Sequence, residues 1–228
     1  MKSPIAYSPL FAWQKARGAK FTDYGPWRLA SVYSRVDEEE TAARSSLALA
    51  DLSALGKVRL HGKGVQDLLR WWFADTKPGR VFPVEQGKFG WVCILSEDQC
   101  LLLAAQPARA RPMNEIAQKL PGFRPELAYE ATNTFACLGL FGPRHEAILR
   151  QLVSLDIGGT ALHAGSCVQT GFAGVPALLV GIAGSLSGAW ILVAWDLAEY
   201  VWERLWQVGS RAGMIPLGME GYLSASKE

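Results

Sequence analysis

A chain of 228 residues can bury a substantial core, in one large domain or in two small ones. With 50% apolar and 19% charged residues, the composition is typical of a globular protein in water. The net charge is only +2 and no run of Lys or Arg accompanies it, which excludes a nucleic-acid surface built on a basic patch.

The first predicted helix lies in the acidic stretch that follows Tyr33. Ser34 and Asp37 have the spacing of a capping box, and the acids at 37–40 suit the positive N-terminal end of a helix. Glu40 and Arg44 form an i,i+4 pair of opposite charge. We interpret the acidic run as a solvated helix face, with an acidic partner surface as the alternative.

A strand, a Gly turn and an amphipathic helix occur twice. The segment Leu60-His-Gly62, followed by Leu69-Arg70, recurs as Leu140-Phe-Gly142, followed by Leu149-Arg150. In both copies, apolar residues or a histidine fill positions i, i+3, i+4 and i+7 of the helix, as expected when one face is packed. Chance similarity is the alternative, because this type of turn is common.

Strand patterns surround both copies. Residues 89–95 and 99–106 predict one pair of strands, and residues 176–182 and 189–194 predict another. The simplest fold is therefore α+β, with two related subdomains and mainly antiparallel sheets. We place the subdomains at 1–120 and 121–228, and strands could be exchanged between the two halves.

Residues 157–195 contain no Asp, Glu, Lys or Arg, which raises the question of a membrane span. Pro176 and the Gly184–Gly188 turn interrupt the stretch, so buried strands joined by a hairpin are favoured over a membrane helix. A further helix is predicted at Asp196–Val208, with Asp196 as its N-cap.

The four cysteines are far apart and form no C-x-x-C pair. Buried free thiols in a reducing cytoplasm are the favoured interpretation, and a disulfide is the alternative. The three histidines are dispersed, so no metal site is expected.

Asp75 is the candidate for chemistry. It follows Trp71, Trp72 and Phe73, and a carboxylate beside aromatic rings can be desolvated and act as an acid or a base. The alternative is a solvated loop aspartate before the turn at Lys77-Pro78-Gly79.

The order of motifs resembles the glycine cleavage T-protein, or aminomethyltransferase. The family segments "GA…DFGGW…Y", "FDVSH" and "NDV" correspond here to GAKFTDYGPW with Tyr33, to ADLSA at 50–54, and to Ala74, Asp75 and Thr76. The resemblance implies a tetrahydrofolate-binding fold for one-carbon transfer, here without the family's C-terminal β domain. It further implies a carrier protein, or an oxidase or other enzyme subunit, as partner.

The resemblance also assigns roles to particular residues. Asp75 takes the place of an acid at the reactive nitrogens of the folate. Leu55 and Phe82 take the places of residues that pack on the pterin. Trp190 replaces a glutamate that grips the pterin edge, and an indole offers only a donor and a π face.

Two functions remain open at this point. One is a divergent enzyme that uses tetrahydrofolate, with Asp75 as the catalytic group. The other is a catalytically silent relative that binds or supports other subunits, in the way the resemblance suggests for the gamma subunit of heterotetrameric sarcosine oxidase. A fold survives the loss of its site easily, because packing and chemistry use different residues.

Overall fold

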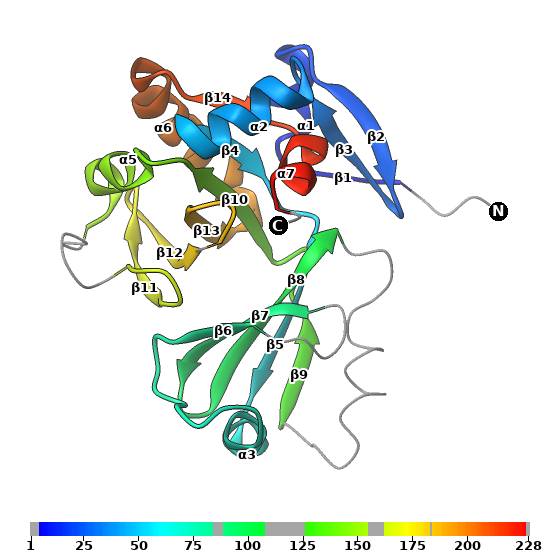
Figure 1. The fold of residues 1–228 in the computed structure, drawn as a ribbon. Coiled ribbons are helices and arrows are strands. Elements are labelled where there is room, and N and C mark those ends of the chain that lie inside the picture. The colour runs from blue at the N-terminus through cyan, green and yellow to red at the C-terminus, as the bar shows by residue number, and fades with distance from the viewer. Residues whose placement is uncertain (1–4, 84–88, 108–125, 155–161, 183, 227–228) are drawn as a thin grey trace.

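The computed structural model describes residues 5–83, 89–107, 126–154, 162–182 and 184–226. Within these residues the strands form three sheets, and helices cover them from several sides (Figure 1). In chain order the elements are β1 (Ala6–Tyr7), α1 (Phe11–Ala16), β2 (Lys20–Tyr24), β3 (Trp27–Val32), α2 (Val36–Ser45), β4 (Ala48–Asp51), β5 (Leu55–His61), α3 (Lys63–Trp72), β6 (Val81–Pro83), β7 (Phe89–Ser96), β8 (Gln99–Pro107), β9 (Leu127–Glu130), β10 (Phe135–Phe141), α5 (His145–Leu152), β11 (Cys167–Phe172), β12 (Val175–Ile182), β13 (Gly188–Ala194), η1 (Trp195–Leu197), α6 (Ala198–Gly209), η2 (Ser210–Ala212), β14 (Ile215–Leu217) and α7 (Met219–Ala225).

The sheets are mainly antiparallel, which confirms the predicted α+β class. The N-terminal sheet has the order β1-β3-β2, the major sheet β11-β12-β13-β10-β4-β14 and the minor sheet β6-β7-β8-β5-β9. In these sheets only β1 with β3 and β14 with β4 run parallel. The minor sheet is inserted in the chain between β4 and β10, so strands from both predicted halves share the major sheet. The predicted boundary at residue 120 lies outside the described residues.

The duplicated unit is present in the fold. Gly62 links β5 to α3 with φ +105°, and Gly142 links β10 to α5 with φ +107°. Only glycine adopts this backbone region readily, which explains why both copies keep it. A Cβ at Gly142 would also lie 2.4 Å from the carbonyl oxygen of Ser46.

The acidic stretch differs from its prediction at two residues, Ser34 and Glu39. Glu40 and Arg44 pair at 3.2 Å as expected, but α2 begins at Val36 without a side-chain cap, so the capping role of Ser34 is wrong. Instead Glu39 turns inward and is fully buried. Its carboxylate accepts hydrogen bonds from the backbone N–H groups of Tyr33 (2.6 Å), Ser34 (2.9 Å) and Gly218 (2.7 Å).

The uncharged segment forms the predicted strands. β12 and β13 pair antiparallel within the major sheet. None of the helices among the described residues has the length and apolarity that crossing a membrane requires. All four cysteines are buried, as their apolar surroundings indicate. The helix predicted at Asp196 begins two residues later, at Ala198, because a 3₁₀ turn at Trp195–Leu197 precedes it and no side chain caps it.

Three apolar cores follow from the alternation of side chains along the strands. One core lies between the facing major and minor sheets and extends to α7. A second lies on the other face of the major sheet under α5 and α6, and a third joins the minor sheet to α3. Residues two apart on one strand therefore face the same core.

Candidate functional site

Leu55 and Trp190 lie in the core between the major and minor sheets. Leu55 begins β5 and Trp190 lies on β13, and each is only 1% exposed. The ring of Trp91, from β7, meets the Trp190 ring edge-on, with centroids 4.7 Å apart and planes at 84°. The indole Nε1 of Trp190 has no hydrogen-bond acceptor among the described residues. The two predicted residues therefore share one apolar environment.

Phe82 lies on the opposite face of the minor sheet. Its neighbour Val81 packs into the core between the sheets, whereas Phe82 packs against the core under α3. The Phe82 ring stacks on Phe73 with centroids 4.4 Å apart and planes at 17°. The Arg80 guanidinium lies 5.8 Å from the centroid of the Phe82 ring.

Asp75 lies in the loop after α3, and 44% of its side chain is exposed. Its carboxylate accepts a hydrogen bond from the backbone N–H of Lys77 at 3.2 Å and lies 3.6 Å from Nε of Arg80. Because Arg80 contacts both Asp75 and Phe82, the four predicted residues fall into two groups, with Leu55 and Trp190 in one and Asp75 and Phe82 in the other. Their roles as site residues stay predictions.

Lys57 was not among the residues predicted to form a functional site. It lies two positions after Leu55 on β5, is fully buried, and its Nζ donates to the carbonyl oxygens of Ser53 (3.0 Å) and Leu55 (2.9 Å). Burial lowers the pKa of Lys57 to about 8, partly offset by Cys137 and Asp51. Lys57 and Arg59 are two residues apart on β5, and the sequence therefore places both cations on one face of the strand. The sequence alone does not show that this face is buried, because the same pattern is usual for a face in contact with water.

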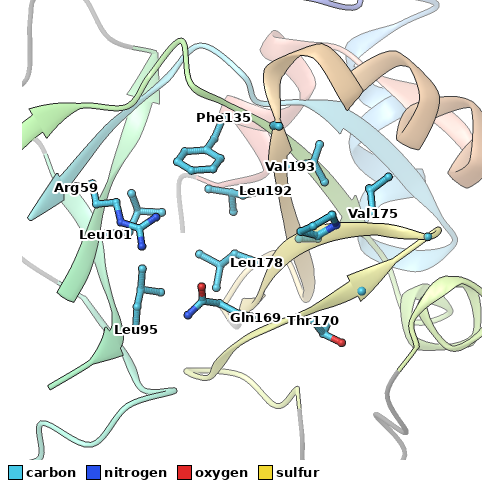
Figure 2. A pocket seen from close by; sticks show the side chains of 15 residues that line it. Arg59, Leu95, Leu101, Phe135, Gln169, Thr170, Val175, Leu178, Leu192 and Val193 are labelled. Atoms are coloured by element: carbon cyan, nitrogen blue, oxygen red, sulfur yellow. The ribbon is translucent and has the colours of Figure 1, made fainter. Parts of the chain in front are cut away.

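A pocket of about 490 Å³ opens between the two sheets (Figure 2). β5, β7 and β8 form one wall, and β10 to β13 form the other. The lining residues are Arg59, Leu95, Leu101, Phe135, Gln169, Thr170, Gly171, Gly174, Val175, Pro176, Ala177, Leu178, Leu192, Val193 and Ala194. None of the four predicted site residues lines it.

Sequence comparison places the chain in a family. The model of the GCVT N-terminal domain matches residues 10–226, and the chain therefore belongs to this family. Aminomethyltransferase from Streptomyces avermitilis is 26% identical over 93% of this chain and 60% of its own length. Sarcosine oxidase subunit alpha from Corynebacterium sp. (strain U-96) is 26% identical over 95% of this chain and 25% of its own length. The present chain thus spans about 60% of the length of these aminomethyltransferases.

Solved structures agree on the fold. The glycine cleavage system aminomethyltransferase T from Bartonella henselae superposes with a TM-score of 0.75 at 18% identity, over 95% of this chain and 60% of that one. A chain of the heterotetrameric sarcosine oxidase from Corynebacterium sp. U-96 superposes with a TM-score of 0.59 at 17% identity, over 77% of this chain and 91% of that one. The T-protein-like fold expected from the sequence motifs is confirmed.

Proposed function

We propose that this chain is a catalytically silent T-protein-like subunit that supports an oligomeric enzyme. The observation that carries the proposal is the packed pair of Trp91 and Trp190, which fills the space between the sheets where the resemblance would put a pterin.

The residues at the assigned positions do not fit tetrahydrofolate. A pterin presents N–H groups that need a buried acceptor, whereas the Trp190 indole is a donor that itself finds no acceptor in the described part of the chain. A folate would also have to displace aromatic packing within an apolar core.

Asp75 supports the same proposal. Its contacts are those of a loop aspartate, with a backbone N–H and a half-exposed guanidinium as partners. A carboxylate with this exposure is in contact with water, which supports the silent assignment over a catalytic role.

The proposed partner is an oxidase subunit. Relatives over nearly the whole chain include the alpha subunits of sarcosine oxidases, and a chain of a heterotetrameric sarcosine oxidase shares the fold over 91% of its own length. A domain that keeps its core but changes its site residues can serve assembly alone.

Folate binding is tested by isothermal titration of the chain with 5-formyltetrahydrofolate. The aminomethyltransferase of Streptomyces avermitilis serves as the binding control. We expect no saturable binding, measured as heat, at ligand concentrations up to about 1 mM, which would detect even a very weak affinity. Saturable binding in the micromolar range would overturn the silent assignment.

Assembly is tested separately by isolating the tagged chain from its own source and passing it through size exclusion. We expect the chain to elute with another subunit at constant stoichiometry and with sarcosine-dependent oxygen consumption. Elution of the chain alone, with the activity in other fractions, would refute the proposed partner.

A further inference from the structure

The space between the sheets is filled at one end and open at the other. Along β13, Trp190, Leu192 and Ala194 face the minor sheet in turn. Trp190 packs on Trp91, whereas Leu192 and Ala194 line the pocket. The pocket is therefore distinct from the positions that the family resemblance assigns to folate.

The pocket walls are largely apolar. Leu95 and Leu101 come from the minor sheet, and Phe135, Leu178 and Leu192 come from the major sheet (Figure 2). The volume of about 490 Å³ lies within the range of small-molecule sites, roughly 300 to 1,000 Å³. Such walls favour a ligand with a hydrocarbon chain or ring.

One cation projects into this apolar space. Figure 2 shows the guanidinium of Arg59 entering from β5 and the amide of Gln169 extending from the opposite wall. Arg59 donates from Nη2 to Oε1 of Gln99 at 2.7 Å, and within the described part of the chain it forms no salt bridge. A guanidinium carries five N–H donors, so most of its capacity remains for a ligand.

We propose that this pocket binds a small monocarboxylate with an apolar chain or ring. The carboxylate would accept the paired N–H donors of Arg59, a geometry that guanidinium favours, and the Gln169 amide would donate to the same group. The apolar part would lie along Leu95, Leu101 and Leu178. A neutral apolar ligand would bury the guanidinium without a counter-charge and leave most of its N–H donors unpaired, which is costly.

Isothermal titration of wild-type protein with octanoate, octanol and octylamine tests the charge preference without any substitution. We expect octanoate to bind at least about tenfold more tightly than octanol, and octylamine to bind most weakly. Equal affinity for octanoate and octanol, or no saturable binding of octanoate, would overturn the proposal.

Substitutions then locate the site. Arg59→Gln should reduce octanoate affinity to that of octanol, whereas Arg70→Gln, an exposed arginine on α3, should leave it unchanged. Ala194→Trp should fill the pocket and weaken octanoate and octanol together. Octanoate binding that survives both Arg59→Gln and Ala194→Trp would assign the ligand to another site. These results are independent of folate binding and of subunit assembly.

Discussion

Trp91 and Trp190 pack edge to face across the two sheets, at 4.7 Å between ring centroids. The pair joins β7 of the minor sheet to β13 of the major sheet, so this contact helps to hold the two sheets together. Its contribution to stability can be measured directly.

Trp190→Ala should lower the free energy of unfolding by about 3 to 5 kcal/mol, because a large buried ring is replaced by a cavity. Trp190→Phe should cost less than about 2 kcal/mol, since it keeps an aromatic ring and removes an N–H that none of the described residues accepts. Urea denaturation measures both. Trp71→Ala is the control, because Trp71 is 68% exposed, and a loss as small for Trp190→Ala as for Trp71→Ala would contradict the buried role.

Glu39→Gln should destabilise the fold by about 2 to 4 kcal/mol. An amide can offer only one oxygen, so its NH₂ group would face a backbone N–H that now donates to the carboxylate of Glu39. Glu38→Gln, the exposed neighbour, should change stability by less than about 0.5 kcal/mol. Similar denaturation midpoints for the two variants would refute the structural role of Glu39.

The duplicated glycines should differ in their tolerance of alanine. Both substitutions place a side chain at a positive φ, which costs of order 1 to 3 kcal/mol. At Gly142 the new Cβ also meets the backbone of Ser46, whereas at Gly62 it meets the side chain of exposed Glu126 at the edge of the minor sheet. Gly142→Ala should therefore be the more destabilising by at least about 1 kcal/mol in chemical denaturation. The reverse order would count against this packing.

Lys57 should make stability depend on pH in a defined direction. Burial lowers its pKa in the folded chain from 10.5 to about 8, so between these values the unfolded chain binds more protons and the free energy of unfolding rises with pH. Below pH 8 both states are protonated and the cost of burying the charge is present in full.

Urea denaturation of wild type and Lys57→Met at several pH values between 8 and 10.5 isolates this effect. The difference between them should shift in favour of wild type by up to about 3 kcal/mol across that range. The nearby Asp51 and Cys137 remain in both proteins. A difference that stays constant with pH would mean that the Lys57 pKa is not lowered.

Local patterns were sufficient to predict the duplicated unit and the strand pairs. Short, nearly continuous apolar runs bounded by turn residues identify β7, β8, β12 and β13, because these strands bury side chains on both faces. Glu39 could not be distinguished from its acidic neighbours, because its partner Gly218 lies far along the chain. Lys57 could not be recognised as buried either, because the alternation of polar and apolar residues around it is equally typical of a strand with one face in water. Phe82 lies on a strand of three residues, too short for its pattern to reveal which face it occupies.

Neither the pocket nor the tryptophan pair could be predicted without knowing how the two sheets pack against each other. Trp91 and Trp190 come from different sheets, and the motifs around them describe only their own strands. Arg59 likewise contacts the pocket only because the major sheet lies across from β5. The distance between Asp75 and Trp190 depends on how the sheets face one another, which local sequence does not encode.

The insertion of the minor sheet between β4 and β10 bears on the order in which the chain acquires structure. During synthesis at the ribosome, β4 emerges well before its antiparallel neighbour β10, and its parallel neighbour β14 emerges last. In the minor sheet, β6 with β7 and β7 with β8 join consecutive strands and can form early, and β5 and β9 then complete the sheet. This sheet shortens the effective loop between β4 and β10, lowering the entropy cost of their pairing.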